Sequence, residues 1–318
     1  MVATLKHTED TQKLQLATDD IVDNSILGFS YISDAIEHEL RVFWEFTWRD
    51  WSASLIPGAM HTIAALRSLD SAPSDLVFRS LTRSLIYFLL YIYSFDIANQ
   101  INGVAEDRIN KPDRPLASGR VTLQGAYVRW YATTALYLAL GAAWGVLPWS
   151  ALWVLNTTYN SFFGGDKHWV TKNLGFMTIG AFCLIQPSWE LVAPLTPHKW
   201  RWALMLSAAF GIVASVQDMR DVEGDKISGR RTLPIVLGSS FRWVMAAIIC
   251  ATPAVCWQLE FLQYSHWLVG YCGVLLTLAM FYMAYRVLHG GSRAYDHKTY
   301  MVFTYIYCGC IAVPMLFP

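Results

Sequence analysis

Long apolar segments recur along the chain, separated by short polar stretches. A helix needs about 20 predominantly apolar residues to cross a bilayer, and only a structure that satisfies its own backbone hydrogen bonds is stable there. The pattern therefore predicts an all-α, polytopic membrane protein, a bundle of about nine transmembrane helices. The predicted spans are residues 51–69, 78–98, 122–141, 143–160, 174–193, 200–217, 234–258, 264–288 and 299–317.

The N-terminal part of the chain lacks this pattern. Residues 1–40 are polar and include TEDTQK and ATDDIVD, so we expect a disordered or surface-lying tail. The segment RVFWEFTWRDW that follows is rich in Trp and Phe, which suit a membrane interface. We accordingly expect two parts, a polar tail with an interfacial segment (1–45) and a single transmembrane domain (46–318).

Composition supports the membrane prediction. Hydrophobic residues make up 54% of the chain and charged residues only 15%, against roughly 25% in soluble domains. The 24 basic and 24 acidic residues balance, which gives no indication of a nucleic-acid partner. The six cysteines all fall in apolar segments and form no CxxC pair, so we expect neither a zinc site nor a disulfide framework.

Charges in the connecting loops predict the orientation. Lys and Arg concentrate in the loops after the second, fourth, sixth and eighth predicted spans, and the alternate loops carry few. By the positive-inside rule the basic loops are cytosolic. The N-terminus is then cytosolic and the C-terminus lumenal or external.

Two carboxylate-rich segments follow apolar spans on this cytosolic side. In the first, Phe95 to Pro115, Asp96, Asn99, Asn102, Gly103, Glu106 and Asp107 would share roughly 140° of a helix surface at about 100° per residue. In the second, Ser215 to Pro234, Asp218, Asp221 and Asp225 would fall within roughly 60°. Oxygen ligands of this kind suit Mg²⁺, which is commonly held by one or two carboxylates and substrate phosphates.

Basic residues adjoin both segments: Lys111, Arg114, Lys226, Arg230 and Arg231. Fixed positive charge would repel a free cation but attract a phosphorylated ligand placed between the carboxylates. An anionic head and an apolar tail, as in a prenyl diphosphate, would match a polar site at the mouth of a membrane bundle. The alternative is a pair of solvated loops with ordinary salt bridges.

The two segments also carry a family resemblance. NQINGVAEDRINKPDRPLASGRVT resembles the first aspartate-rich motif of the UbiA superfamily of intramembrane prenyltransferases, and QDMRDVEGDKISGRRTLPIVLG resembles the second. The likeness runs from about residue 45 to the end of the chain. It implies a bundle around a central cavity, open near the cytosolic side, with Mg²⁺ bridging both motifs to a diphosphate.

One position departs from the usual first motif, which has Asp where this chain has Gly103. Glu106 precedes Asp107, and this pattern is similar to fungal UbiA-type membrane terpene cyclases, including the sesquiterpene cyclase type of the fumagillin pathway. The resemblance then implies a metal set of Asn99, Glu106, Asp107, Asp218, Asp221 and Asp225, with Asp96 and Asn102 as further ligands or as supports of the ligands.

The resemblance also assigns roles to other side chains. Asp107, Asp218, Asp221 and Lys172 are the expected catalytic residues. The expected diphosphate contacts are Arg49, Lys111, Arg114, Lys167, Lys172, Lys226 and Arg230. A carbocation would need an electron-rich wall, for which Tyr91, Tyr93, Phe95, Tyr159, Phe162, Phe163 and Trp169 are candidates, although each also suits an interfacial belt.

Three functions remain open on the sequence. The first is a Mg²⁺-dependent cyclase that converts a prenyl diphosphate, farnesyl diphosphate by expectation, to a sesquiterpene. The second is a prenyltransferase with an aromatic or other acceptor, and the third a non-enzymatic carrier or binder of anionic lipid. The basic residues beside both acidic segments disfavour a cation carrier. We expect an integral protein of the endoplasmic reticulum membrane with its site facing the cytosol, and no required protein partner.

Overall fold

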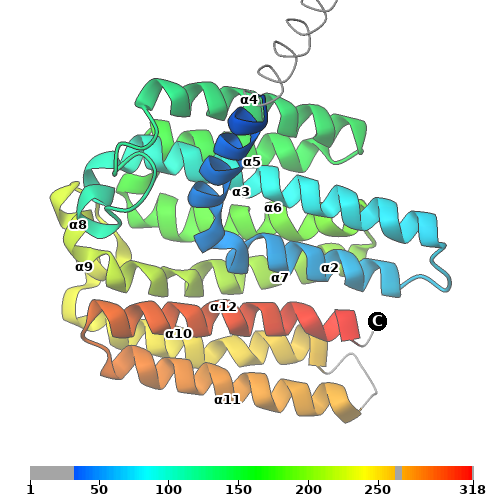
Figure 1. Ribbon diagram of the computed structural model, residues 1–318. Helices are drawn as coiled ribbons and strands as arrows, with labels where there is room; N and C mark the ends of the chain where they lie inside the picture. The colour runs from blue at the N-terminus through cyan, green and yellow to red at the C-terminus, as the bar shows by residue number, and fades with distance from the viewer. Residues whose placement is uncertain (1–31, 262–266, 317–318) are drawn as a thin grey trace, which may run out of the picture. The chain divides into compact units, whose positions relative to one another are not determined.

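The computed structural model describes residues 32–261 and 267–316. These residues form helices joined by short connections, and the described ranges contain one isolated β-bridge, between His168 and Arg231, but no strand (Figure 1). The elements are η1 (Trp48–Ala53), α2 (Leu55–Arg67), α3 (Ser74–Asn110), α4 (Leu123–Ala143), α5 (Leu147–Phe162), η2 (Gly165–Lys167), η3 (Val170–Phe176), α6 (Met177–Glu190), α7 (Pro197–Val213), η4 (Ala214–Arg220), α8 (Val222–Ile227), α9 (Leu233–Leu237), η5 (Gly238–Ser240), α10 (Phe241–Cys256), η6 (Trp257–Phe261), α11 (Trp267–His289) and α12 (Arg293–Leu316).

The chain divides into two units, Met1–Glu45 and Phe46–Pro318. In the first unit residues 32–45 are helical, and Arg41 pairs with Glu37 one turn earlier at 2.7 Å. The tail predicted at residues 1–40 lies outside the described part up to residue 31.

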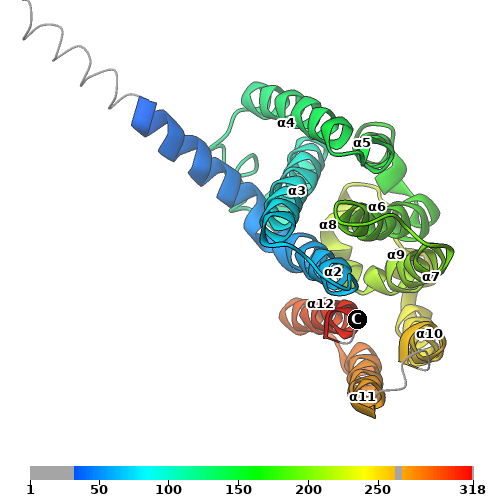
Figure 2. The same cartoon turned by 90° about the vertical axis from the view of Figure 1, so that its right-hand side faces the viewer.

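The long helices of the second unit form a closed ring. Each of α2, α3, α4, α5, α6, α7, α10, α11 and α12 contacts the next, and α12 contacts α2 (Figure 2). Helix starts follow local chemistry: the Thr122 and Thr196 hydroxyls accept backbone N–H bonds at the starts of α4 and α7. Pro197 adds a fixed φ at the first residue of α7.

Every predicted span overlaps one of these helices. Among the described residues, five helices are long and apolar enough to cross a membrane: Ser74–Asn110, Pro197–Arg220, Leu233–Leu259, Trp267–His289 and Arg293–Leu316. By contrast, α2, α5 and α6 have 13, 16 and 14 residues, fewer than the about 20 of a straight span. The total number of crossings therefore stays a prediction.

Three helices differ from their predicted forms in ways that matter for the site. α3 runs 37 residues, through Asn110, so the first acidic segment is helical as far as that residue and includes Glu106 and Asp107. The predicted span 200–217 changes from α-helix to a 3₁₀ helix, η4, at Ala214. The predicted span 174–193 begins inside a π-helix, η3, that ends at Phe176.

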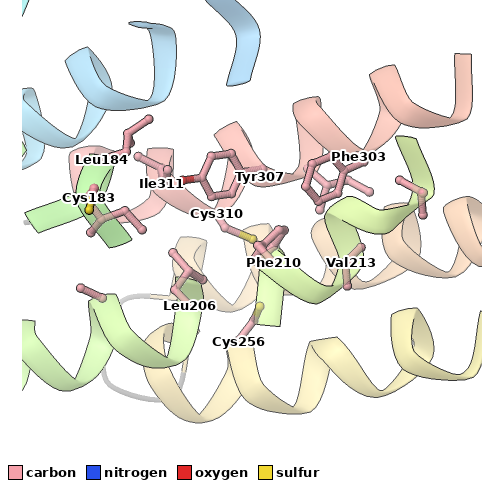
Figure 3. Packing of buried hydrophobic residues seen from close by; sticks show 14 of the residues in the cluster. Cys183, Leu184, Leu206, Phe210, Val213, Cys256, Phe303, Tyr307, Cys310 and Ile311 are labelled. Carbon is pink, nitrogen blue, oxygen red and sulfur yellow. The ribbon is translucent and has the colours of Figure 1, made fainter. Parts of the chain in front are cut away.

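The apolar core lies between the helices of the ring. Figure 3 shows Phe210 and Val213 of α7 packed with Phe303, Tyr307 and Cys310 of α12 and with Cys256 of α10. Phe210 and Tyr307 have ring centroids 5.3 Å apart. The six cysteines, all within the described ranges, are free thiols.

Candidate functional site

A cavity lies inside the second unit where the two acidic segments meet, the end of α3 contacting α8. Charged and aromatic side chains both line it. Along α3 the aromatic part, Tyr91 and Phe95, comes before the charged part, Glu106 and Asp107. The charged lining residues are Asp50, Glu106, Asp107, Lys111, Arg114, Asp166, Lys172, Asp218, Arg220, Asp221 and Arg230. The aromatic lining residues are Tyr91, Phe95, Trp153, Phe176, Phe210, Tyr300, Phe303 and Tyr307.

The first acidic segment presents one face of α3 to this cavity. Asn99, Gly103, Glu106 and Asp107 line it, as the 3.6-residue periodicity predicts. Asp96 is fully buried but is not among the described lining residues. Asn102 also lies outside the lining set, and its side-chain amide donates a hydrogen bond to Asp166 at 3.0 Å.

The second acidic segment is not the single helix that its spacing predicted. Asp218 belongs to the 3₁₀ helix η4, Asp221 lies at a break with φ −107° and ψ 4°, and Asp225 belongs to α8. A 3₁₀ turn followed by a break does not keep the 100° rotation that the prediction assumed. Asp218 and Asp221 line the cavity, whereas Asp225 is not among the described residues that do.

Asp225 instead forms contacts within the protein. Its carboxylate accepts hydrogen bonds from Arg230 Nη1 at 3.3 Å and Thr232 Oγ1 at 3.1 Å. Burial, together with the nearby Asp218, raises the pKa of Asp225 to about 6. The metal-ligand role predicted for Asp225 therefore has less support from the geometry than the same role for Asp218 and Asp221.

A third segment, the loop from Gly164 to Asn173, also belongs to the site. Gly164 has φ +78°, a left-handed turn that favours glycine. Backbone hydrogen bonds from Arg231 N to Lys167 O (2.8 Å) and from Trp169 N to Arg231 O (3.0 Å) join this loop to the second acidic segment. The loop thus places Asp166 and Lys172 at the cavity.

The sequence predicts site roles for Lys167 and Lys172 in this loop but not for Asp166 and Asn173. Asp166 lines the cavity, and Asn173 donates a hydrogen bond to Asp218 Oδ2 at 2.6 Å. The GGDKHWVTKN stretch held the available signal: a glycine pair followed by charged residues between two apolar spans.

Each lining carboxylate of the two motifs has a basic partner. Glu106 pairs with Arg230, Asp107 with Arg114 at 3.0 Å, Asp218 with Lys172 at 2.9 Å, and Asp221 with Lys111 at 3.3 Å. All eight side chains are at least four-fifths buried. Breaking a pair of this kind is costly because it leaves a buried charge uncompensated.

Burial and pairing shift the pKa values of these groups. Burial alone would raise the pKa of Asp221, but Lys111 and Arg220 hold it below its ordinary value. Burial would lower the pKa of Lys172, but Asp218 and Asp225 raise it. Burial lowers the pKa of Arg230 to about 10. Asp221 and Lys172 are therefore both charged at neutral pH.

The predicted basic residues divide into two groups. Lys111, Arg114, Lys172 and Arg230 line the cavity. Arg49, Lys167 and Lys226 are not among the described lining residues, and Arg49 pairs with Asp113. Arg220, which the sequence reasoning passed over, does line the cavity and lies 4.5 Å from the centroid of the Tyr300 ring.

The oxygen-rich donor set fits a hard cation such as Mg²⁺. Asn99, Glu106, Asp107, Asp218 and Asp221 all line the same cavity, and Asp221 Oδ1 is buried without a hydrogen-bond partner in the described part of the chain. Among the described residues no three Asp, Glu, His or Cys side chains are gathered closely enough to hold a metal by themselves. The arrangement suits a cation that takes part of its ligands from a phosphate.

The aromatic wall is built mainly by residues that the sequence did not single out. Trp153 stacks on Tyr91 with ring centroids 4.1 Å apart, and Phe176 lies 5.5 Å from Trp153. Hydrogen bonds from Trp153 Nε1 to Tyr91 O and from Tyr91 OH to Gly180 O, both 2.9 Å, fix the stack.

Of the seven predicted aromatic residues, only Tyr91 and Phe95 are among the described lining residues. The others that were predicted are Tyr93, Tyr159, Phe162, Phe163 and Trp169. Tyr159 and Phe163 are 50% and 74% exposed, as an interfacial belt would be.

Comparison with known proteins agrees with this geometry. The model of the UbiA prenyltransferase family matches residues 55–307. A protein of Hericium erinaceus named diterpene cyclase eriG is 39% identical over 87% of this chain and 88% of its own length. A second protein of that organism, named polyprenyl transferase eriF, is 37% identical over 86% of this chain and 93% of its own.

The fold has a solved counterpart. A UbiA homologue from Archaeoglobus fulgidus, whose structure was determined bound to GPP and Mg²⁺, superimposes with a TM-score of 0.64 at 16% identity, covering 86% of this chain and 99% of that one. The apolar helices and these likenesses identify an integral membrane protein. The names of the relatives confirm the prediction of a UbiA-type enzyme, a cyclase or a transferase. The chain therefore belongs to the UbiA prenyltransferase family.

Proposed function

We propose that the protein ionises a prenyl diphosphate and cyclises the resulting allylic cation without an external acceptor. The observation that carries this proposal is the division of one cavity into a charged part and an aromatic part. The charged part suits a diphosphate, and the aromatic part suits a hydrocarbon chain that becomes cationic. A lipid carrier would need an apolar surface for the lipid tail but would not need the faces of aromatic rings.

In this proposal the charged part holds the diphosphate. Lys111, Arg114, Lys172 and Arg230 supply fixed positive charge, with Arg220 as an addition from the geometry. Mg²⁺, held by Asp107, Asp218, Asp221, Asn99 and Glu106, would neutralise negative charge on the departing diphosphate. Donors that are already in place when charge develops are the main source of stabilisation in such a step.

The prenyl chain then reacts only with itself. The C1–O bond breaks, its electron pair leaves with the diphosphate, and the allylic cation forms beside the wall of Trp153, Tyr91 and Phe176. A π bond of the same chain attacks the cationic carbon, and loss of a proton from a neighbouring carbon gives a cyclic hydrocarbon. The aromatic faces stabilise the cation by about 1–2 kcal/mol each when water is excluded.

Two features support cyclisation over transfer to an acceptor. Gly103 stands where the usual motif has Asp, as in the fungal cyclase pattern, and a relative 39% identical is named a diterpene cyclase. As candidate substrates we propose farnesyl diphosphate, the C15 compound predicted from the sequence, and its C20 homologue. The second is included because the relative is named a diterpene cyclase. Transfer to an acceptor is the second candidate, favoured by the relative named a polyprenyl transferase.

We also propose that residues 46–318 form one transmembrane domain of nine spans, with the cavity opening toward the cytosol. The basic loops after alternate spans and the position of both acidic segments at one end of the helices support this orientation. The endoplasmic reticulum is the proposed membrane. Cysteine accessibility at Lys226→Cys and Thr196→Cys in sealed microsomes tests the orientation, since only the first should be labelled from the cytosolic side.

A single assay tests the function. Purified protein in nanodiscs is incubated with Mg²⁺ and radiolabelled C10, C15 or C20 diphosphate, with no acceptor, and the hexane extract is analysed. A cyclic hydrocarbon supports the proposal. Product that forms only after an aromatic acceptor is added would establish the transferase instead, and an alcohol from slow hydrolysis alone would reject both enzymatic functions.

A further inference from the structure

Asp166 is a buried acid that neither motif contains. It lies in η2, is only 5% exposed, and lines the cavity. Carboxylates are seldom buried this deeply unless they are paired. The next residue, Lys167, accepts a backbone hydrogen bond from Arg231. This bond holds the Asp166 segment against the second acidic segment.

The carboxylate of Asp166 joins the two motif segments through one oxygen. Oδ2 accepts hydrogen bonds from Arg230 Nε at 2.8 Å, in the second segment, and from Asn102 Nδ2 at 3.0 Å, in the first. Its Oδ1 is buried and has no hydrogen-bond partner in the described residues. A purely structural acid would be expected to satisfy both oxygens. A carboxylate oxygen only accepts hydrogen bonds, so the unpaired Oδ1 at the cavity is open to a donor or a cation.

Arg230 is the group that this arrangement orients. Its Nε donates to Asp166 and its Nη1 to Glu106 and Asp225. Its Nη2 lies toward Gly103, 3.9 Å from the place where a Cβ on that residue would stand. The absence of a side chain at Gly103 therefore leaves room in front of the guanidinium, on a face that lines the cavity.

Building on the function proposed above, we propose that Asp166 is a positioning residue for the diphosphate. It holds the Arg230 guanidinium by Nε so that Nη2 points past Gly103 into the charged part of the cavity, where it donates to a diphosphate oxygen. Without Asp166, the guanidinium would turn toward its two remaining carboxylates, Glu106 and Asp225. The loop after α5 would then be part of the substrate site and not only a connection between helices.

A double-mutant cycle on inorganic pyrophosphate binding tests this role. Binding is measured with Mg²⁺ present, by titration calorimetry of protein in nanodiscs, for wild type, Asp166→Ala, Arg230→Ala and the double variant. We expect Asp166→Ala to weaken binding about 10–100-fold, the usual cost of removing a residue that orients a ligand. Because Asp166 acts through Arg230, the same change in the Arg230→Ala background should weaken binding by less than about twofold.

Two further variants separate positioning from folding. Asp166→Asn keeps an oxygen acceptor without the charge, and we expect it to fold like wild type with an intermediate affinity. Asp296→Asn removes a buried acid that pairs with Arg242 at 2.7 Å, and neither residue of this pair is among the described residues that line the cavity. It should lower thermal stability and leave pyrophosphate affinity unchanged.

The outcomes are distinguishable. Two results would overturn the positioning role while leaving the proposed function in place. One is that the losses of pyrophosphate affinity caused by Asp166→Ala and Arg230→Ala multiply in the double variant. The other is that Asp166→Ala and Asp166→Asn both bind pyrophosphate as tightly as wild type. If wild type neither binds pyrophosphate nor releases it from any prenyl diphosphate, the proposed function fails first and this inference fails with it. Michaelis constants measured in parallel should rise more than kcat falls.

Discussion

Replacing Trp153 with Leu tests whether the aromatic wall stabilises a cation. Trp153 is 3% exposed, lines the cavity, and stacks on Tyr91 at 4.1 Å. Leu keeps an apolar side chain but removes the π face. A desolvated cation–π contact of about 1–2 kcal/mol corresponds to roughly a 5- to 30-fold fall in the rate of ionisation and cyclisation.

Trp149 provides a matched control on the same helix. It lies one turn before Trp153, is 9% exposed, and donates through its indole nitrogen to Glu190. It packs against Phe182 and Trp200 and is not among the described residues that line the cavity. Trp149→Leu thus removes a similar ring and a similar hydrogen bond, and both variants should lose a few kcal/mol of stability from truncation of a large buried side chain.

The measurement is kcat from pyrophosphate release at saturating prenyl diphosphate and Mg²⁺, together with the ratio of cyclic hydrocarbon to alcohol. We expect Trp153→Leu to lower kcat 5- to 30-fold and to raise the share of alcohol, since a less stabilised cation is captured by water more often. Trp149→Leu should leave both quantities within about twofold of wild type at a temperature where both variants are folded. Equal losses in the two variants would refute a specific role for Trp153.

Three further outcomes are expected. EDTA should abolish turnover and added Mg²⁺ should restore it, because carboxylates and diphosphate are both anionic; turnover in EDTA would exclude a metal-dependent mechanism. Asp218→Ala and Asp221→Ala should each lower kcat by at least about a hundredfold, and full activity in either variant would remove that residue from the metal set. Gly211→Ala should lower the melting temperature, because its Cβ would stand 2.4 Å from Thr178 Oγ1 and 2.7 Å from Thr178 Cα on the facing element. The control Gly270→Ala, whose Cβ meets nothing within 4 Å, should be neutral or stabilising by about 0.5–1 kcal/mol; equal effects of the two glycine substitutions would contradict the close packing.

Features that depend on local periodicity were predictable from the sequence. The nine apolar ranges each overlap a helix, because an apolar run of this length has few alternatives in a membrane. The face of α3 that carries Asn99, Glu106 and Asp107 was also predicted, because that segment is a continuous helix. The metal and diphosphate roles assigned to these residues remain predictions.

Features that depend on backbone breaks or distant contacts were not predictable. Asp225 is not among the described lining residues, in keeping with the 3₁₀ geometry of η4 and the break at Asp221, which no spacing rule signals. Asp166 reaches the site through the backbone pairing of its neighbour Lys167 with Arg231, 64 positions along the chain. Trp153 and Phe210 resembled any other core residue, because an apolar cavity is lined by the same residue types as an apolar core.

The π-helix η3 has a consequence for how the chain tolerates changes in length. A π turn accommodates one more residue than an α turn. η3 itself carries Lys172 and leads directly into α6, which supplies Met177, Gly180 and Leu184 to the cavity. Removal of one residue from η3 would allow an ordinary α-helix but would rotate one side of the junction against the other by about 100°. The Lys172 side chain and the apolar side chains farther along α6 would then no longer face the same space. The extra residue therefore sets the rotation of α6 relative to the residues before it, so that both contribute to one cavity. A chain without it would need a compensating insertion elsewhere in the same loop.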